Sequence, residues 1–447
     1  MLNKSKNSFP IDLSNHNLSK FDILKPKYDR SKISPGILHI GVGNFHRAHL
    51  SWYLHRLMQK NKSMDWGIIG SGVLNYDYQM REKLNKQDYL TTLIELDPSG
   101  NKNCEIIGSM IDYVPVKKNN EPLINAIADT NIRIVSLTVT EGGYYIDGRS
   151  GLLNINHDEI IRDIKHPKEP QTVFGAIVKA LGIRKDNGYG PITCLSCDNL
   201  IKNGEKLKQA ILGIAQNIDK ELSTWIEDNC TFPNSMVDCI VPRTGERELS
   251  LVKKIGIIDE VPVVHENFRQ WVVEDNFCAG RPQWEEVGVQ FSSQVQQYED
   301  QKIRMLNAGH QIIANAGELL GLNTIDKALE HKGILSMFEK VTKEEIIPHV
   351  DPLPDLSPSD YYQLILNRFS NPEIKDTVRR VAFDGSSRHS IFIVPSIKKA
   401  ISRAQLMKEL LPGLNALFGL EYAKYSDETQ EIFETEASDR SFEEEVK

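Results

Sequence analysis

A short apolar strand is predicted at 37–40, and it runs directly into the turn Gly41-Val42-Gly43 and then into a helical pattern that reaches Met58. Further strands are predicted at 66–69, 133–139 and 192–196. Segments with helical spacing separate these strands, and such alternation is typical of a parallel sheet with helices on both faces. The first part of the chain is therefore expected to be an α/β domain of the Rossmann type, which binds dinucleotides.

The pattern changes after about Gln290, where helical spacing replaces the alternation. Three helices are expected toward the end of the chain, at 357–368, 371–381 and 394–411. We therefore expect a Rossmann-type NAD-binding domain with an N-terminal arm at 1–293, followed by an all-helical substrate and catalytic domain with an acidic tail at 294–447. The cleft between two such domains is a usual place for a substrate.

The composition excludes several classes of protein. The net charge is −8 at pH 7, and the tail at 426–447 holds nine acids and two bases, so the body is almost neutral. No basic stripe is present, which argues against a nucleic-acid partner. No apolar run approaches the roughly 18–20 residues that a bilayer requires, and the N-terminus lacks the apolar core of a secretory signal. A cytoplasmic protein without membrane spans is expected.

Cysteine usage gives no sign of a disulfide framework or a metal site. Six cysteines in 447 residues are too sparse for such a framework. Cys194 and Cys197 form a CxxC, but they lie in an apolar run that is typical of a buried strand. No second pair stands at zinc spacing, so no bound metal is expected.

The glycine turn matches the start of a nucleotide-binding fingerprint. In that fingerprint the first glycine permits the tight turn, and the second lets the backbone approach a pyrophosphate. His46 stands where a third glycine is usual, so Gly41 and Gly43 are also compatible with simple turn chemistry. The nearest acid for the ribose hydroxyls is Asp77, for which the alternative is a helix N-cap.

One predicted helix carries polar residues on an otherwise apolar face. At about 100° per residue, Lys302, Asn307 and His310 fall within an arc of about 140°. A lysine whose pKa is lowered by desolvation can act as a general base on an alcohol, while an amide and an imidazole donate hydrogen bonds to the developing oxyanion. The alternative is a lysine that extends to solvent and a histidine that is satisfied in the core.

Seven segments, in order, resemble the polyol-specific long-chain dehydrogenases/reductases, also called the mannitol dehydrogenase family. They are IGVGNFHRAH at 40–49, TVTEGGY at 138–144, SCDNL at 196–200, FPNSMVD at 232–238, FRQWVVED at 268–275, KIRMLNAGH at 302–310 and DGS at 384–386. Within the family the mannitol 2-dehydrogenases are the most similar. The resemblance therefore implies metal-independent hydride transfer between NAD(H) and a polyol/ketose pair, with D-mannitol and D-fructose as the expected pair.

The same resemblance implies a role for each residue of the Lys-Asn-His helix. The lysine of the KxxxxNxxH segment is the general acid/base of the family, which assigns that role to Lys302. Asn199 and Asn307 are expected to hold the reacting oxygen, and His310 is expected to orient the substrate. The acid three residues before the lysine, Glu299, is expected to help the proton to pass to solvent.

Substrate and cofactor contacts follow from the resemblance in the same way. Asp238 is expected to line the site, and Arg380 and Arg388 are expected to bind the other hydroxyls of the substrate. The family usually carries a lysine at the position of Arg388, for which a surface ion pair is the alternative. The expected cofactor contacts are Gly41, Gly43, Asn44, Phe45, His46, Arg47, Asp77, Thr140 and Glu141.

Several alternatives stay open at this point. NAD is expected, but NADP is not excluded, because Asn75 occupies a loop position where relatives often carry an acid. The substrate pair could instead be that of a D-arabinitol 4-dehydrogenase or of a fructuronate or tagaturonate reductase, whose substrate carboxylate needs a cation. A nucleotide-binding protein without catalysis is the alternative of a different class. The family implies a monomer.

Overall fold

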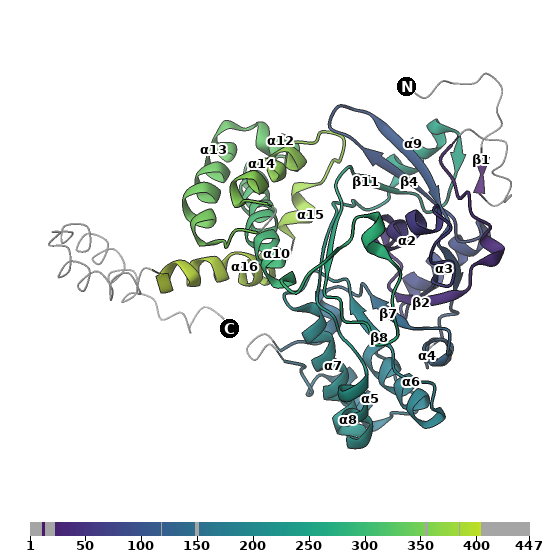
Figure 1. The fold of residues 1–447 in the computed structure, drawn as a ribbon. Coiled ribbons are helices and arrows are strands. Elements are labelled where there is room, and N and C mark those ends of the chain that lie inside the picture. Colours follow the sequence, from purple (N-terminus) through teal and green to yellow (C-terminus); the bar gives the residue numbers. More distant parts are fainter. Residues whose placement is uncertain are drawn as a thin grey trace, which may run out of the picture.

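The computed structural model describes the chain at 11–13, 23–117, 119–147, 152–353, 356–383 and 385–403 (Figure 1). Most of the expected N-terminal arm, the acidic tail and Asp384 lie outside these residues. The described part falls into an α/β portion and a helical portion, as predicted (Figure 1). None of its helices combines the length and the apolar character needed to cross a membrane.

A five-stranded parallel sheet forms the centre of the first domain. Its strand order is β6-β3-β2-β7-β8, and every neighbouring pair is parallel. The strands are β2 (Pro35–Ile40), β3 (Gly67–Ser71), β6 (Met110–Tyr113), β7 (Ile134–Leu137) and β8 (Thr193–Ser196). This topology confirms the predicted Rossmann-type domain, and it places the ends of β2, β7 and β8 side by side.

Helices cover both faces of this sheet because its strands are apolar on both sides. In β2, Leu38 and Ile40 pack into one core cluster and Ile37 into another, as the two-residue period of a strand requires. The first cluster takes in α4 (Glu121–Ala128), α6 (Val173–Asn187) and α7 (Asn203–Ile218). The second takes in α2 (Leu50–Met58) and α3 (Asn75–Lys86). Cys194 and Cys197 are free and buried, one in each cluster, which agrees with a buried strand.

Two smaller sheets, which the sequence did not predict, connect the Rossmann sheet to the helical domain. One has the order β11-β4-β5 and the other β13-β12-β9. Their strands are β4 (Thr91–Leu96), β5 (Lys102–Ile107), β9 (Ser235–Asp238), β11 (Val263–Glu266), β12 (Gln270–Val273) and β13 (Gln290–Phe291). Two strand ends are important for the site, since β9 ends at Asp238 and β11 ends at Glu266.

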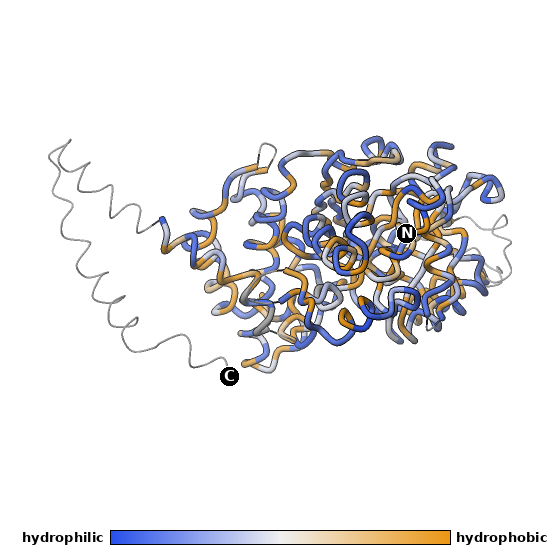
Figure 2. Tube along the Cα trace, turned by 90° about the horizontal axis from the view of Figure 1, so that it is seen from below, coloured by the Kyte–Doolittle hydropathy of each residue, from blue (hydrophilic) through white to orange (hydrophobic). Residues whose placement is uncertain are grey.

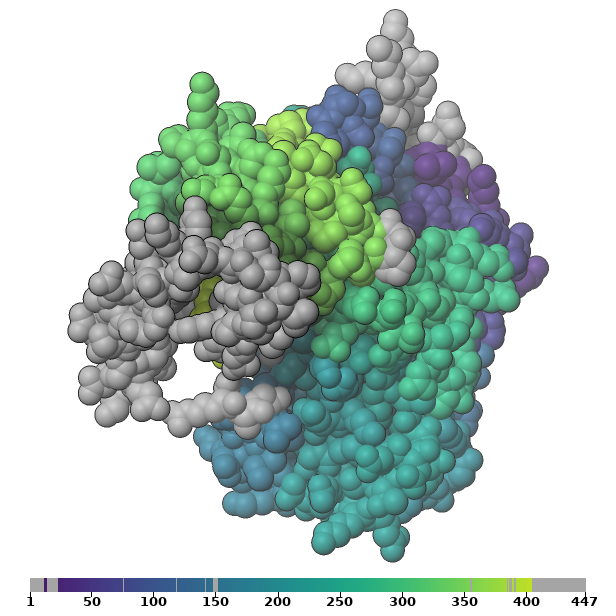
Figure 3. All heavy atoms as spheres, turned by 60° about the vertical axis from the view of Figure 1, so that its left-hand side comes forward, coloured from purple at the N-terminus to yellow at the C-terminus, as the bar shows by residue number. Residues whose placement is uncertain are grey.

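The helical domain begins with one long helical stretch. This stretch consists of α10 (Val295–Gln301), a π-helical turn (Lys302–Asn307) and α11 (Ala308–Leu319). The helices that surround it are α12 (Ile325–Glu330), α13 (Lys332–Lys340), α14 (Pro358–Phe369), α15 (Val378–Ala382) and α16 (Gly385–Phe392). Its core also contains Ile94 and Ile106 of the β4–β5 hairpin, so the two domains share buried apolar residues. Hydrophobic segments run through both domains in Figure 2, and in Figure 3 the green and yellow atoms of the helical domain lie against the blue and teal atoms of the first domain.

The predicted helices of this domain have mixed outcomes. The helix predicted at 357–368 is confirmed by α14. The helix predicted at 371–381 is wrong over most of its length, because only α15 at its end is helical. The preceding helix ends at Phe369, and Asn371 stands in the turn that follows. The side-chain NH₂ of Asn371 donates a hydrogen bond to the carbonyl oxygen of Leu96, and its side-chain oxygen accepts one from the backbone N–H of Glu373. Residues 394–403 are helical, and the rest of the third predicted helix lies outside the described residues.

Candidate active site

A cavity of about 480 Å³ opens where the ends of β2, β7, β8 and β9 meet the helical stretch of Lys302. It is lined by Gly41, Gly43, Asn44, Phe45, Thr138, Thr140, Cys197, Asp198, Asn199, Val237, Asp238, Cys239, Ile240, Val241, Lys302, Leu306, Asn307, His310 and Arg380. The size is typical of small-ligand sites. The cavity therefore brings together most of the site residues predicted from the sequence, and it takes them from both domains.

The glycine turn forms one wall of this cavity. Gly41 has φ +94°, and a Cβ there would lie 2.2 Å from the carbonyl oxygen of Thr138, so no other residue fits. Gly43 has an extended backbone, and a Cβ there would meet only the carbonyl oxygen of Gly41 at 4.0 Å. The space in front of Gly43 is thus open toward the cavity. This is the arrangement that a pyrophosphate needs in order to approach the backbone.

Two of the predicted cofactor residues lie behind the turn instead of in the cavity. His46 is buried and stacks on His39 with ring centroids 3.5 Å apart. Arg47 is also buried, and it donates hydrogen bonds to the carbonyl of Gly43 at 3.2 Å and to the side-chain oxygen of Asn44 at 2.8 Å. Both side chains therefore support the shape of the turn from behind.

Asp77 has the local contacts of a helix cap. Its carboxylate accepts hydrogen bonds from the backbone N–H groups of Val73 at 3.0 Å and Leu74 at 2.8 Å, at the start of α3. It is not among the residues that line the cavity. The described structure thus supports the capping alternative for Asp77. The side chains of Asn75 and Glu141 lie outside the described residues.

Asp198 also lines the cavity, although no role was predicted for it from the sequence. Its carboxylate accepts hydrogen bonds from the backbone N–H of Val139 at 3.1 Å and of Thr140 at 2.8 Å, and from the hydroxyl of Tyr144 at 2.8 Å. These bonds turn the chain away from the sheet, so β7 ends at Leu137 and not at 139 as predicted. Thr140 is held at φ +68°, a strained conformation of the kind that concentrates at functional sites. The only sequence signal for Asp198 was its position next to Asn199.

Lys302 reaches across the cavity to the first domain. Its ammonium donates hydrogen bonds of 2.7 Å to the side-chain oxygen of Asn199 and of 2.7 Å to the carbonyl oxygen of Val237. The residue is 7% exposed, so the alternative of a lysine extended to solvent is wrong. The lysine and the asparagine come from different domains and are joined directly.

The helix around Lys302 is not α-helical, which corrects the predicted geometry. Residues Lys302–Asn307 form a π-helical turn between α10 and α11. In an α-helix Lys302 and Asn307 would differ in direction by about 140°, whereas the i→i+5 bonding of a π turn brings them close to the same face. Single π turns of this kind are frequent at functional sites. The turn explains how both side chains line one cavity.

Asn307 and His310 complete the wall formed by this helix. Among the described residues, the side-chain oxygen of Asn307 is buried without a hydrogen-bond partner, although it lines the cavity. The ring of His310 stacks on Phe369 with centroids 4.0 Å apart. Burial lowers the pKa of His310 to about 4, so its imidazole is neutral near pH 7. Both groups are therefore available to neutral, hydroxyl-bearing ligands.

Glu299 lies one turn before Lys302 and does not line the cavity. It is buried, and its carboxylate accepts a hydrogen bond of 2.8 Å from the backbone N–H of Lys202. Burial raises the pKa of Glu299 to about 8, because the charged form is poorly solvated. A carboxyl group that titrates near 8 can exchange a proton at physiological pH.

The predicted substrate residues differ in what they contact. Asp238 and Arg380 line the cavity, and Arg388 does not. Arg380 forms a bidentate ion pair with Asp376 at 2.5 and 2.7 Å. The guanidinium of Arg388 donates to the carbonyl oxygens of Val381 at 2.8 Å and of Arg380 at 3.4 Å. Arg388 therefore supports the end of α15 in this structure.

Asp238 has a partner that the sequence did not reveal. Arg368 of α14 donates hydrogen bonds of 2.7 and 2.8 Å to the two carboxylate oxygens of Asp238. It also donates bonds of 2.7 and 2.9 Å to Glu266. All three side chains are buried. No local pattern could have identified Arg368, because its partners stand 130 and 102 residues earlier in the chain.

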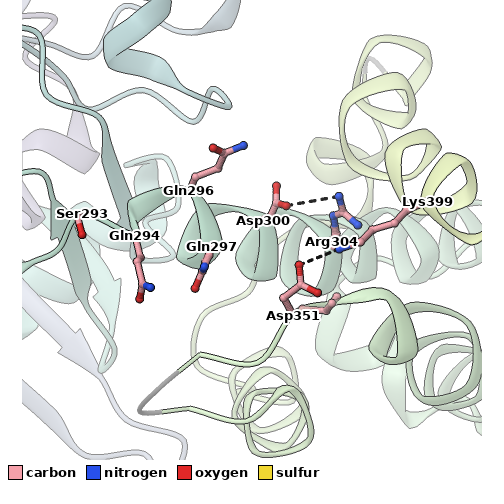
Figure 4. A pocket seen from close by; sticks show the side chains of 9 residues that line it. Ser293, Gln294, Gln296, Gln297, Asp300, Arg304, Asp351 and Lys399 are labelled. Carbon is pink, nitrogen blue, oxygen red and sulfur yellow. Dashed lines mark hydrogen bonds and ion pairs between the residues drawn. The ribbon is translucent and has the colours of Figure 1, made fainter. Parts of the chain in front are cut away.

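A second cavity, of about 320 Å³, lies along the other side of α10 (Figure 4). It is lined by Ser293, Gln294, Gln296, Gln297, Asp300, Arg304, Val350, Asp351 and Lys399. Arg304 pairs with Asp300 at 3.5 Å and Lys399 pairs with Asp351 at 3.0 Å (Figure 4). Since Lys302 lines the first cavity and Arg304 lines the second, the helical stretch around the π-helical turn contributes to the walls of both cavities. Across the described ranges, no group of three or more His, Cys, Asp or Glu could hold a metal ion.

Comparison with known proteins identifies the family and supports the fold. The family model for the mannitol dehydrogenase Rossmann domain matches residues 35–286, and that for the mannitol dehydrogenase C-terminal domain matches 294–445. A mannitol 2-dehydrogenase of Cereibacter sphaeroides is 49% identical over 389 residues, which cover 87% of this chain and 81% of the relative. A polyol:NADP oxidoreductase of Gluconobacter oxydans is 37% identical over 93% of this chain and 85% of the relative.

Among solved structures, the mannitol 2-dehydrogenase of Pseudomonas fluorescens, in a ternary complex with NAD and D-mannitol, superimposes with a TM-score of 0.85. It is 39% identical, and the match covers 88% of this chain and 81% of that one. Both the fold and the order of the two domains are therefore shared with a protein that binds a dinucleotide and an open-chain polyol.

Proposed function

The chain belongs to the mannitol dehydrogenase family, and we propose that it catalyses the reversible oxidation of D-mannitol to D-fructose with NAD. The names of the relatives support a polyol as the alcohol, and the ternary complex of the Pseudomonas protein supports NAD. Because a polyol:NADP oxidoreductase is among the relatives, NADP is the cofactor to test against NAD. We also propose domains at 1–293 and 294–447 and action as a cytoplasmic monomer.

The residues at the glycine turn fit a dinucleotide. Gly41 and Gly43 would hold the pyrophosphate, since the space in front of Gly43 is open, and Thr138 and Thr140 line the cavity beyond it. When bound, NAD supplies the nicotinamide that accepts a hydride from the alcohol carbon. The division near residue 293 gives the cofactor contacts to the first domain and the proposed acid/base residue to the second.

The observation that carries the proposal is the position of Lys302. Its ammonium lies in the cavity, is nearly buried and is fixed by Asn199 and Val237. In the oxidation direction the neutral amine of Lys302 accepts the proton of the reacting hydroxyl and becomes the ammonium, and in the reduction direction the ammonium returns a proton to the ketose oxygen. It therefore serves in the place that a metal occupies in other alcohol dehydrogenases.

Two asparagines are proposed to hold the reacting oxygen. Because the side-chain oxygen of Asn199 accepts from Lys302, its NH₂ group is the donor that is left for substrate. The NH₂ of Asn307 is the second donor, and its buried oxygen can accept from a substrate hydroxyl. The neutral imidazole of His310 adds one donor and one acceptor. Together these groups stabilise an alkoxide as charge develops.

The proton that Lys302 takes up must leave the buried site. Glu299 is proposed to receive it, because this carboxyl lies one helical turn from Lys302 and has a pKa of about 8. The backbone N–H of Lys202 holds one of its oxygens in place. Glu299 thus connects a buried ammonium to solvent without itself touching the substrate.

The charges in the cavity favour a neutral polyol over a uronate. A uronate carboxylate needs an available cation, but Arg380 is engaged by Asp376 and Arg388 by backbone carbonyls. The carboxylate of Asp198 also lines the cavity, where a negative charge repels an anion. Polyol/ketose turnover is therefore the proposal, with D-arabinitol as the alternative substrate and uronate reduction as the less favoured one.

The test is an enzyme assay with two cofactors and a panel of substrates. Oxidation of NADH and NADPH is followed with D-fructose, a pentulose, fructuronate and tagaturonate, and reduction of NAD and NADP is followed with D-mannitol, D-sorbitol and D-arabinitol. Activity with D-fructose and NADH is expected. Activity on a uronate or pentulose alone would change the substrate and keep the mechanism. Cofactor binding without turnover on any compound would contradict the proposed activity.

A further inference from the structure

Arg368 lies at the centre of a buried group of three charges. It extends from α14 of the helical domain and is 5% exposed. Its guanidinium forms bidentate hydrogen bonds with Asp238 at the end of β9 and with Glu266 at the end of β11. The ring of Phe268 lies 4.2 Å from the guanidinium carbon and covers one face of it. One side chain of the second domain thus joins two strand ends of the first.

We propose that Arg368 is a positioning residue that fixes the Asp238 carboxylate, in its ionised form, as a hydrogen-bond acceptor for a hydroxyl of the substrate. This inference rests on the proposed polyol dehydrogenase function. Asp238 lines the cavity and Arg368 does not. The inference therefore adds a residue that acts on the substrate through Asp238.

The geometry of the pair supports a positioning role. Two parallel N–H···O bonds from a planar guanidinium prevent a carboxylate from rotating, which a single bond does not. Each oxygen of Asp238 accepts one bond from Arg368 and keeps a lone pair for another donor. A lysine at this position would keep the charge and lose the fork. The orientation of Asp238 therefore depends on an arginine.

The balance of charge supports an ionised Asp238. Burial raises the pKa of Asp238, but the charge and hydrogen bonds of Arg368 hold it below its usual value. Burial also raises the pKa of Glu266, and in that case Arg368 does not compensate fully. Arg368 therefore acts on both carboxylates, and its charge and hydrogen bonds stabilise the ionised form of each. Asp238, which faces the cavity, keeps its charge.

Other groups also act on the charge of Asp238. They are Lys302 and His310 from the helical stretch, Tyr361 from α14, Cys239, and His49 and Tyr53 from the segment after the glycine turn. Burial lowers the pKa of both histidines, so they are neutral near pH 7. Lys302 and Arg368 are thus the cations that stabilise the carboxylate, and only Arg368 is hydrogen-bonded to it among the contacts described.

The test compares Arg368→Gln and Arg368→Lys with the wild-type enzyme. Loss of a held, charged acceptor is expected to raise the KM for D-mannitol about 10- to 100-fold in Arg368→Gln, while the KM for NAD is unchanged. The apparent pKa of the acid limb in the pH profile of kcat/KM is expected to rise by about 1–3 pH units, because Asp238 loses its cation. Arg368→Lys should show a smaller pH shift than Arg368→Gln and a similar rise in KM.

Two further variants separate positioning from stability. Arg184→Gln removes another buried arginine, whose guanidinium binds only backbone carbonyls among the contacts described, far from the cavity residues. It should lower the melting temperature and leave the KM for D-mannitol unchanged. The double variant Arg368→Gln/Glu266→Gln also removes the negative charge of Glu266, which loses its cation when Arg368 is replaced. The double variant should therefore recover stability, while its KM for D-mannitol stays high. A wild-type KM in Arg368→Gln or in the double variant would overturn the proposal, as would an equal loss of NAD affinity.

The failure of the proposed function is distinguishable from the failure of this inference. If the wild-type enzyme turns over none of the polyols, the function is contradicted and the inference is then tested by ¹³C NMR of aspartate carboxyl carbons. The Asp238 signal, assigned by its absence in Asp238→Asn, should titrate at a higher pH in Arg368→Gln than in the wild-type protein. An unchanged titration would overturn the role of Arg368.

Discussion

The ammonium of Lys302 donates a 2.7 Å hydrogen bond to the side-chain oxygen of Asn199, which stands 103 residues earlier in the chain. Lys302 belongs to the π-helical turn of the second domain, and Asn199 follows β8 of the first. The bond therefore fixes the proposed proton-transfer group relative to one of the proposed oxygen-binding amides. Such preorganisation reduces the cost of reaching the transition state.

Replacement of Lys302 by Ala should lower kcat by about 10²–10⁴-fold, because the proposed general acid/base is lost. The dissociation constant of NADH should change little, since the lysine lies beyond the glycine turn. Kinetics and fluorescence titration with NADH measure the two quantities. Lys343→Ala, which removes an exposed lysine paired with Glu339, is the matched control. An equal loss of NADH binding in Lys302→Ala would show that the lysine is structural.

Asn199→Ala and Asn307→Ala should each lower kcat by about 10²–10³-fold with a smaller change in KM. The reason is that an amide donor to the reacting oxygen is most valuable when that oxygen carries negative charge, which is in the transition state. Steady-state kinetics with D-mannitol checks this. A rise in KM at constant kcat would identify the asparagines as simple substrate contacts.

Burial raises the pKa of Glu299 to about 8, so we expect the activity to depend on pH near this value. The carboxyl can accept a proton only when ionised, so the kcat of D-mannitol oxidation should rise as the pH passes through about 8. Reduction of D-fructose needs the protonated form and should fall over the same range. Glu299→Gln should remove both dependences near pH 8. Identical pH profiles in the wild-type enzyme and in Glu299→Gln would exclude Glu299 from the proton path.

Much of this site was predictable from local sequence, and the physical reason is that its signals are local. The strand that runs into Gly41 predicts the turn at the start of the Rossmann-type domain, and the glycine itself indicates a position where the backbone needs a positive φ. The spacing of Lys302 and His310 identifies their helix. In each case the residues that matter lie within a few positions of one another.

The remaining features depend on contacts between distant segments. Arg368 lies in an amphipathic helix and looks like a surface residue until α14 packs against the ends of β9 and β11. The π turn at Lys302 is not encoded by any simple periodicity, so an α-helix was predicted. The sequence allows Asp77 to be either a ribose ligand or a helix cap, and its contacts with the backbone of Val73 and Leu74 become visible only in the structure.

Several buried histidines predict that the protein loses stability in acid. Burial lowers the pKa of His39, His49 and His265 to about 3 and that of His310 to about 4. The unfolded chain, with ordinary pKa values near 6.5, binds more protons than the native state below that pH. The free energy of unfolding should therefore fall as the pH is lowered from about 6.5 toward 4. Urea unfolding across this range measures it, and a constant free energy would contradict the burial of neutral histidines.

The two glycines of the turn give a matched pair of variants with opposite expected effects. Gly43→Ala adds a methyl group into open space, where a Cβ meets only the carbonyl oxygen of Gly41 at 4.0 Å, so the melting temperature of the apo protein should not change. The methyl group occupies the space proposed for the pyrophosphate, and the dissociation constant of NADH should rise about tenfold or more. Calorimetry measures both quantities.

Gly41→Ala should act on folding instead of on binding. Its φ of +94° is unfavourable for alanine, and its Cβ would lie 2.2 Å from a backbone oxygen of Thr138 that cannot move without breaking the strand end. The free energy of unfolding should fall by about 2 kcal/mol or more. If Gly43→Ala left NADH binding intact while Gly41→Ala destabilised the protein as expected, the turn would be a structural corner and the cofactor would have to bind elsewhere.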